Sequence, residues 1–126
     1  RPLVDAESIR LCMDTVAREK ACVLATPVKD TIKVADQAGY AAQTPDRSTL
    51  WAVQTPQCFQ CDLLMRAYER LFFRLKDGSL QIPITDDAMI VEQMMGQKVR
   101  LIPGRYTNIK ITTPEDLDVA ALFLNR

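Results

Sequence analysis

The chain has 126 residues, of which 16 are basic and 16 acidic, so its formal net charge at pH 7 is zero. A neutral chain produces no long-range field, which argues against a nucleic-acid coat or a polybasic membrane anchor. Hydrophobic residues make up 48% and charged residues 25% of the chain, a balance typical of one folded globular domain. No apolar run approaches the roughly 18 residues that crossing a bilayer requires.

The sequence contains no histidine. This excludes Ser-His and Cys-His nucleophile pairs, and it excludes every metal site that includes a histidine ligand. Any chemistry must therefore use Lys, Arg, Asp, Glu, Thr and the backbone.

The four cysteines do not resemble a disulfide framework. Cys12 falls in a helical pattern and Cys22 in an apolar run, where free thiols pack as small hydrophobic groups. Cys58 and Cys61 form a lone C-x-x-C without a second pair at zinc-site spacing. We therefore expect reduced thiols in a reducing compartment.

The chain begins with the pattern of an α/β repeat. Asp5 can cap a helix whose apolar residues recur at helical spacing and predict one buried stripe. These residues are Ile9, Cys12, Met13, Val16 and Ala17. Residues 21–26 follow as a short apolar run that stops at Pro27, which favours a strand buried on both faces.

Residues 28–47 predict a protruding β-hairpin arm. Two extended segments, 31–34 and 40–44, flank a turn at residues 36–39, and few large apolar side chains occur here. Because a two-stranded hairpin is marginally stable alone in water, the arm should pack either on its own domain or on a second chain. We favour the second chain.

A second strand and a long helix are expected next. Residues 50–54 predict a strand that ends at Thr55-Pro56-Gln57, and a helix then follows Asp62 and stops at Gly78. The apolar residues of that helix are Leu64, Ala67, Tyr68, Leu71 and Leu75.

A loop over residues 81–84 precedes a shorter helix. Thr85 is the expected N-cap, with two acidic residues in the first turn, and Gly96 ends the helix. A narrow buried seam is expected along this helix. Its residues are Ala88, Val91 and Met95.

The C-terminal part predicts a strand, an extended segment and a helix. The strand spans residues 98–102 and stops at Pro103-Gly104, and residues 108–112 are a strand or an extended segment. Thr113-Pro114-Glu115-Asp116 combines an N-cap threonine, a proline at the first helical position and an acid three residues after the cap. The expected buried stripe of this last helix comprises Leu117, Ala120, Ala121 and Leu124.

Three polar segments lie near the expected carboxyl ends of strands, where ligands bind in α/β sheets. They span residues 47–57, 85–87 and 108–110. Taken singly, Arg47 could be a solvated arm residue, Thr85 only a cap and Lys110 one of several surface lysines. Together they offer two cations and threonine hydroxyls, the groups of an anion clamp, and phosphate is the natural ligand. No Gly-rich phosphate-loop motif occurs.

Five motifs occur in an order and at a spacing that resemble one known family. They are Asp30-Thr31-Ile32-Lys33, Asp46-Arg47-Ser48-Thr49-Leu50-Trp51, Gln54-Thr55-Pro56-Gln57, Thr85-Asp86-Asp87-Ala88 and Asn108-Ile109-Lys110-Ile111-Thr112-Thr113-Pro114-Glu115-Asp116-Leu117. Together they resemble the C-terminal half of the 2-C-methyl-D-erythritol 4-phosphate cytidylyltransferases. The resemblance covers essentially the whole chain.

The resemblance implies a Rossmann-like sugar-nucleotidyltransferase fold with the hairpin as its arm. In this family methylerythritol phosphate attacks the α-phosphorus of CTP and pyrophosphate leaves, a step of non-mevalonate isoprenoid biosynthesis. Arg47 would lie on the arm, cross to the second subunit of a homodimer and hold the substrate phosphate. Thr55 and Thr85 would hydrogen-bond methylerythritol phosphate, and Lys110 would position the attacking phosphate. A phosphate oxygen is already largely ionised at pH 7, so the reaction needs no histidine base.

The family's CTP-binding half carries a Gly-rich loop and an acidic metal ligand in a His-Asp-Ala-Ala-Arg-Pro segment. Arg1-Pro2 resembles the end of that segment, so we expect the loop and the acidic ligand to precede residue 1. The first residues also resemble neither a signal peptide nor a start at an initiator methionine. Residues 1–126 would then form a partial cytidylyltransferase domain with its arm at about 28–47. We expect this chain alone to bind no nucleotide or metal and to be inactive, and the complete enzyme to use a divalent metal, Mg²⁺.

Two alternatives stay open at this point. One is a pentitol (ribitol) phosphate cytidylyltransferase, and the other is a non-catalytic dimerisation or binding module that kept the arm. Thr85-Asp86-Asp87-Ala88 and the Leu50-Trp51 pair favour methylerythritol phosphate. The expected location is the cytoplasm of a bacterium, or the plastid of a plant or alga, with no nucleic-acid or membrane partner.

Overall fold

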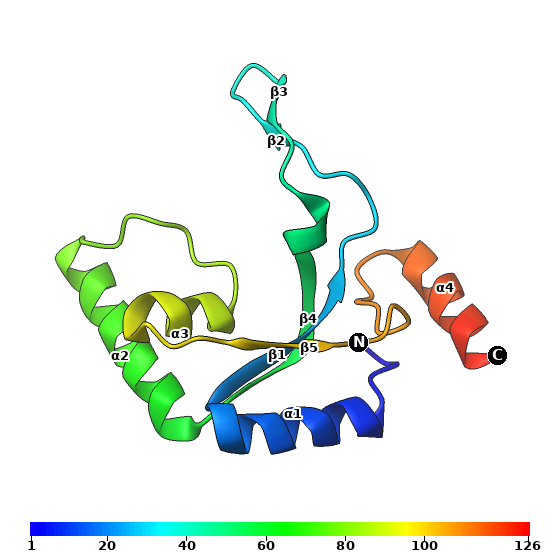
Figure 1. The fold of residues 1–126 in the computed structure, drawn as a ribbon, viewed down its shortest axis with the longest axis horizontal. Helices are drawn as coiled ribbons and strands as arrows, with labels where there is room; N and C mark the ends of the chain where they lie inside the picture. Colours follow the sequence, from blue (N-terminus) through cyan, green and yellow to red (C-terminus); the bar gives the residue numbers. More distant parts are fainter.

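A three-stranded sheet in the order β4-β1-β5 organises the chain (Figure 1). The computed structural model describes all residues, 1–126. The elements in chain order are α1 (Ala6–Glu19), β1 (Ala21–Pro27), β2 (Val34–Ala35), β3 (Ala41–Gln43), a 3-10 turn (Arg47–Thr49), β4 (Trp51–Phe59), α2 (Cys61–Asp77), α3 (Asp87–Met95), β5 (Arg100–Pro103) and α4 (Pro114–Leu124).

The central strand is β1, as its apolar sequence predicts. It pairs antiparallel with β4 and parallel with β5, and every residue from 21 to 26 is buried. A strand that is paired along both edges and covered on both faces is typical of a mixed α/β sheet. The prediction of an α/β fold is therefore confirmed.

Alternate side chains of β1 enter two separate cores. Cys22 and Leu24 pack with Cys12 of α1 and with Ile102 of β5. On the opposite face, Ala21 joins a cluster from α2 and α3. Because successive strand residues point to opposite faces, one short strand holds α1 on one side of the sheet and α2 with α3 on the other.

The expected end of β4 at Thr55-Pro56-Gln57 is wrong, since the strand continues to Phe59. Its last residues pair with the start of β1, where Ala21 lies opposite Phe59 and Val23 opposite Gln57. The pairing is irregular between Val23 and Ala25. An edge strand tolerates a proline at such an irregularity. Residue propensity alone instead predicts that the strand ends at the proline.

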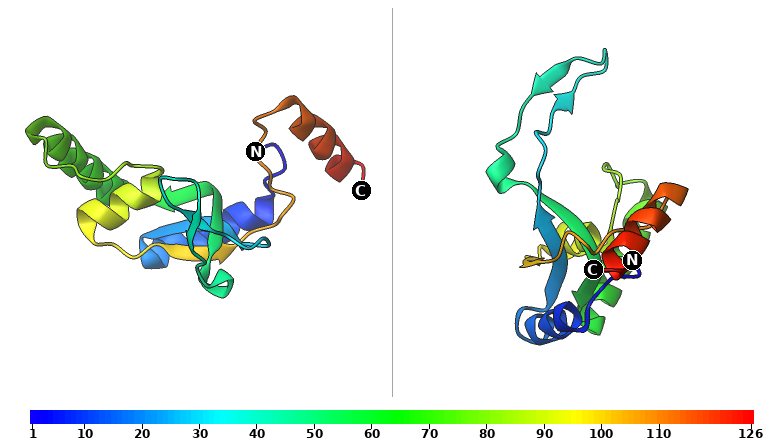
Figure 2. Two further views of the ribbon diagram at one scale, coloured as in Figure 1. Left: turned by 90° about the horizontal axis from the view of Figure 1, so that it is seen from above. Right: turned by 90° about the vertical axis from the view of Figure 1, so that its right-hand side faces the viewer.

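The predicted hairpin is present and stands away from the main sheet (Figures 1 and 2). Strands β2 and β3 form their own two-stranded sheet, and all their residues are exposed. At the turn, Asp36 Oδ1 accepts hydrogen bonds from the backbone of Ala38 and Tyr40, both at 2.9 Å. Gly39 adopts a φ of 89°, which favours glycine.

The cap of α3 differs from the prediction. Asp86, not Thr85, is the N-cap, and its side chain accepts a hydrogen bond from Met89 N–H at 2.8 Å. The narrow seam is also wrong, because Ile90 and Met94 are buried as well. Helix α3 contacts both α2 and β1, so it buries more than one stripe.

Two predicted apolar stripes remain largely exposed. In α1, Cys12 is buried and Val16 half-buried, but Met13 is 62% exposed. Helix α4 lies beyond the sheet on the side away from α2 and α3, and Leu124 is 70% exposed (Figures 1 and 2). No other element of the chain covers these faces, so amphipathic spacing alone could not place them in a core.

Residues 108–112 form an extended loop without strand pairing, and α4 begins as predicted. Asp116 Oδ2 accepts backbone hydrogen bonds from Thr112 and Thr113, both at 2.9 Å, and one from the Thr112 hydroxyl at 3.1 Å. Because these bonds favour the charged carboxylate, they lower the pKa of Asp116 to about 2.

We expect the start of α4 to depend on pH through Asp116. A carboxyl whose folded pKa is depressed stabilises the fold above its unfolded pKa of about 3.9 and loses that effect as pH falls towards the folded value. Backbone chemical shifts of residues 114–118 should therefore lose helical character between about pH 4 and pH 2. Asp116→Asn should weaken this first turn already at neutral pH, whereas the exposed neighbour substitution Glu115→Gln should not. An Asp116→Asn protein with wild-type shifts would contradict this role.

Candidate functional site

An open pocket of about 480 Å³ lies where β4, the start of α3 and the loop before α4 meet. It is lined by Arg1, Val53, Gln54, Thr55, Gln57, Thr85, Asp86 and Lys110. Three of the four residues singled out in the sequence, Thr55, Thr85 and Lys110, therefore line one pocket. Residues more than 50 positions apart in the chain meet here because β4 and the loop after β5 lie side by side.

Two cations of the pocket are free to bind an anion. Neither Lys110 nor Arg1 forms an ion pair with a carboxylate. Arg1 Nη1 donates to the Asn108 carbonyl at 2.6 Å, which holds the guanidinium at the pocket. Burial lowers the pKa of Arg1 from its ordinary value, but a guanidinium stays charged in proteins.

Asn108 fastens the Lys110 loop to β4. Its side chain is only 3% exposed, and its Nδ2 donates to Gln54 Oε1 at 3.1 Å and to the Thr55 carbonyl at 2.9 Å. Gln54 Nε2 in turn donates to the Arg105 carbonyl at 3.0 Å. These bonds connect the backbone segments that carry Thr55 and Lys110.

Gly104 allows the loop to approach β4 this closely. A Cβ atom at this position would lie 2.6 Å from Gln54 Oε1, closer than real contacts allow. The Gly104 N–H also donates to the Ala25 carbonyl at 2.8 Å, which continues the attachment of this segment to β1. In the sequence, Pro103-Gly104 indicates only the end of a strand.

Gln57 joins β4 to the start of α3. Its Nε2 donates to Asp86 Oδ2 at 3.2 Å, and its Oε1 accepts from Ala88 N–H at 3.2 Å. These two bonds fix the start of α3 against β4. Thr85, which directly precedes Asp86, therefore lines the same pocket as Thr55. The Thr85 hydroxyl is exposed and donates to Met89 Sδ at 3.6 Å, so it can turn towards a ligand.

Arg47 is not brought to this pocket. It is exposed in the turn at the base of the hairpin, and its Nη1 donates to the Lys29 carbonyl at 2.8 Å. Asp46 caps the turn by accepting from Ser48 N–H at 3.0 Å and from the Ser48 hydroxyl at 2.7 Å, and these bonds lower the pKa of Asp46. Within one chain, therefore, only three of the four predicted residues share a site.

The lining residues do not fit a divalent metal ion. Asp86 is the only carboxylate among them, and both of its oxygens accept hydrogen bonds, from Met89 N–H and from Gln57 Nε2. Mg²⁺ prefers near-octahedral coordination by several oxygen ligands. These lining residues alone therefore do not complete such a coordination shell.

The sequence did not single out several residues of this pocket and its hydrogen-bond network. Arg1 was identified only as part of the Arg1-Pro2 pair, and its place in the pocket depends on a contact with Asn108 across 107 positions. Gln54, Gln57 and Asn108 are ordinary polar residues until burial and hydrogen bonding identify them as positioning groups. Their one signal in the sequence is that they lie within the motifs that resemble the family.

The fold and the pocket define an α/β protein in which one pocket gathers a lysine, an arginine and two threonine side chains at one edge of the sheet. Charged donors and hydroxyls in this arrangement can hold a phosphate group by charge-assisted hydrogen bonds. No histidine or free carboxylate is available there for acid-base chemistry.

Comparison with known proteins identifies the family. The family model described as 2-C-methyl-D-erythritol 4-phosphate cytidylyltransferase matches residues 1–126. The chain belongs to the 2-C-methyl-D-erythritol 4-phosphate cytidylyltransferase family.

Two curated relatives illustrate the similarity. The 2-C-methyl-D-erythritol 4-phosphate cytidylyltransferase of Lachnospira eligens is 50% identical over 125 residues, which cover 98% of this chain and 53% of the relative. That of Caldanaerobacter subterraneus subsp. tengcongensis is 49% identical over 126 residues, which cover 100% of this chain and 52% of the relative. The chain thus spans about half the length of the curated relatives it matches.

Solved structures share the fold. The 4-diphosphocytidyl-2C-methyl-D-erythritol synthase of Anaerococcus prevotii superimposes with a TM-score of 0.85 at 35% identity, over 100% of this chain and 53% of that one. The 2-C-methyl-D-erythritol 4-phosphate cytidylyltransferase of Thermus thermophilus gives a TM-score of 0.80 at 31% identity, over 100% of this chain and 58% of that one.

We expect Asn108→Ala to destabilise the fold by about 1–3 kcal/mol, because Gln54 Oε1 and the Thr55 carbonyl then lose a buried donor. Urea denaturation measures the loss. Gln93→Ala is the matched control, since Gln93 is exposed and its side chain makes no hydrogen bond; it should change stability by less than about 0.5 kcal/mol. Equal effects of the two substitutions would refute the anchoring role of Asn108.

Proposed function

We propose that this chain is the substrate-binding and dimerisation half of an enzyme that transfers a cytidylyl group from CTP to 2-C-methyl-D-erythritol 4-phosphate and releases pyrophosphate. The observation that carries the proposal is the convergence of Lys110, Thr55 and Thr85 on one pocket. Membership of the family supports this proposal and favours methylerythritol phosphate over a pentitol phosphate as the substrate. The reaction belongs to non-mevalonate isoprenoid biosynthesis.

The proposed chemistry uses the phosphate of methylerythritol phosphate as the nucleophile. One of its oxygens forms a bond to the α-phosphorus of CTP, and the bond from that phosphorus to the pyrophosphate leaving group breaks. The attacking group is ionised at neutral pH, since its second pKa is about 6, so no protein base is required. The remaining obstacle is the repulsion between two anions, which fixed cations reduce.

In this mechanism the chain's own residues bind and orient the substrate. Lys110 and Arg1 neutralise its phosphate, and the hydroxyls of Thr55 and Thr85 fix its orientation. Because β4, α3 and the Lys110 loop are held together by Asn108 and Gln57, the cations occupy their positions before the substrate arrives. Such preorganisation lowers the cost of aligning the reacting atoms.

The arm would complete the site across a homodimer. The hairpin of residues 28–47 extends from the domain with its strands exposed, and Arg47 lies at its base, outside the pocket of its own chain. A second copy that receives this arm would gain a further phosphate-binding cation. The arm would then be both the dimer contact and part of the partner's site.

The proposed complete domain is Rossmann-like, and residues 1–126 are its C-terminal part. Its other half would bind CTP and a divalent metal ion, Mg²⁺, which would supply charge stabilisation at the phosphates. No helix in this structure combines the length and the apolar character needed to traverse a membrane. We place the enzyme in the bacterial cytoplasm, or in a plastid if the source is a plant or alga.

Lys110→Ala in the complete enzyme should lower kcat/KM for methylerythritol phosphate by roughly 10- to 100-fold, the effect of losing one charge-assisted hydrogen bond to phosphate. Pyrophosphate release measures the rate. Lys76→Ala on the exposed end of α2 is the control and should leave the rate unchanged. An effect of Lys110→Ala below about tenfold on kcat/KM would sink the assignment.

Subunit mixing tests whether Arg47 acts in the partner's site. Arg47→Ala and Lys110→Ala homodimers should both be impaired. In a mixed dimer, the subunit with Arg47→Ala keeps its own Lys110 and receives an intact Arg47 from its partner, so one site is restored. Activity should therefore reappear on mixing. If Arg47 served its own chain, each site would keep one defect and mixing would restore nothing.

A further inference from the structure

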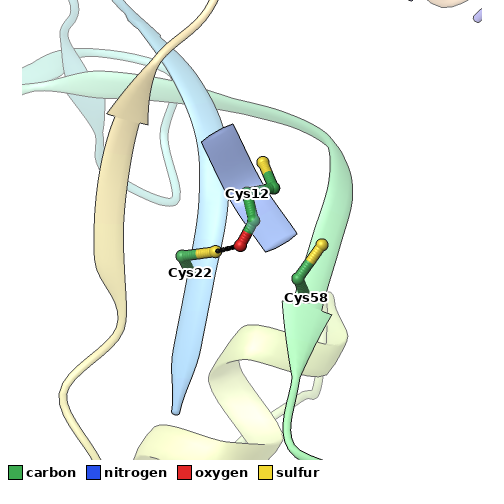
Figure 3. A group of neighbouring side chains, drawn as sticks. All are labelled: Cys12, Cys22 and Cys58. Carbon is green, nitrogen blue, oxygen red and sulfur yellow. Dashed lines mark hydrogen bonds between the residues drawn. The ribbon is translucent and has the colours of Figure 1, made fainter. Parts of the chain in front are cut away.

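Three cysteine thiols from three different elements converge in the core of the chain (Figure 3). Cys12 lies on α1, Cys22 on β1 and Cys58 on β4, and their sulfur atoms all lie within 4.8 Å of one another. Cys22 and Cys58 are direct partners across the antiparallel strand pair. The fourth cysteine of the C-x-x-C motif, Cys61, is exposed and lies outside this group.

Two of the three thiols lie in an apolar part of the core. Cys12 and Cys22 are 0% exposed, and they pack with Leu24, Ile102 and Val16. Burial raises the pKa of Cys12 to about 11 and that of Cys22 to about 12, and only the neighbouring thiols add a charge effect. Redox-sensing cysteines instead need exposed thiolates of low pKa, so this group is not suited to oxidation.

The number of ligands and their burial decide which thiophilic element fits. Zn²⁺ with three thiolates would leave one uncompensated negative charge, and a structural zinc site needs a fourth ligand, which no further cysteine, histidine or carboxylate supplies here. Cu⁺ with three thiolates would leave two negative charges. An unpaired charge in an apolar core is strongly unfavourable. A trivalent element bound by three thiolates leaves no net charge.

We propose that Cys12, Cys22 and Cys58 form a binding site for one trivalent arsenic centre, supplied as arsenite. Each thiol exchanges with one hydroxyl of arsenous acid: an S–As bond forms, an As–O bond breaks, and the thiol proton leaves with that hydroxyl as water. Three exchanges release three waters, and nothing is oxidised or reduced. Half-buried Cys58 is the thiol at which the reaction starts.

Binding requires the three sulfur atoms to move closer together. Thiolates bound at about 2.3 Å to one pyramidal centre lie roughly 3.4 Å apart, so sulfurs now within 4.8 Å need to approach by at most about 1.4 Å. The Cys22 thiol at present donates weakly to the Cys12 carbonyl at 3.3 Å, and that bond is given up. The bound arsenic would link α1 to both β1 and β4.

Arsenite added in equimolar amount to the complete protein tests the site. Native mass spectrometry should show a gain of one arsenic atom and a loss of three hydrogens, and thiol titration after unfolding in the absence of competing thiols should find three fewer free thiols. Because the arsenic joins three elements of the native fold, the thermal midpoint should rise. Cys61→Ser is the matched control and should behave as wild type.

Cys58→Ser should lose the three-thiol product while keeping its midpoint without arsenite close to that of wild type, which shows that it folds. Cys58→Ala gives a second, independent variant with the same expected loss. The proposal is overturned if arsenite leaves the wild-type mass and midpoint unchanged, or if the product persists in both Cys58 variants. It is equally overturned if the protein as purified carries stoichiometric zinc or copper that disappears in Cys58→Ser, because the ligand class would then be wrong.

Discussion

The structure depends on the double pairing of β1. This strand bonds to β4 on one edge and to β5 on the other, while its two faces bury separate cores under α1 and under α2 with α3. A seven-residue strand could not hold three helices by its own propensity. Burial of apolar surface on both faces supplies the main driving force, and the ladder bonds fix the register that brings each face to its helix.

The same register builds the pocket. Since β4 continues past Thr55 and runs beside the loop that follows β5, Asn108 can donate to both Gln54 and the Thr55 carbonyl. Gly104 permits that approach because it has no side chain to collide with Gln54. The polar groups of the site therefore rest on hydrogen bonds that the buried Asn108 and Gln54 side chains donate. Loops held in this way can present exposed groups such as Lys110 in a defined position.

Much of the fold was predictable because it follows from local chemistry. Three such features depend only on neighbouring residues. They are the apolar run at residues 21–26, the left-handed glycines that end α2 and α3, and the acid at the third position of α4. Two kinds of prediction were wrong. The N-cap of α3 was placed one residue too early, since Asp86 rather than Thr85 accepts the Met89 N–H, and the apolar faces of α1 and α4 are not covered by other elements of this chain. Amphipathic spacing shows that a face is apolar but not what lies against it.

The candidate site divides in the same way. The residue types of the site, cations and hydroxyls without histidine, can be read directly from the sequence, and so can the order of five motifs that resemble one family. Those properties depend only on composition and spacing. The folded chain brings Thr55, Thr85 and Lys110 to one pocket with Arg1 and leaves Arg47 apart on the arm. Folding also places Cys58 beside Cys12 and Cys22 rather than beside Cys61. Strand pairing and helix packing set these distances, and both join residues that lie far apart along the chain.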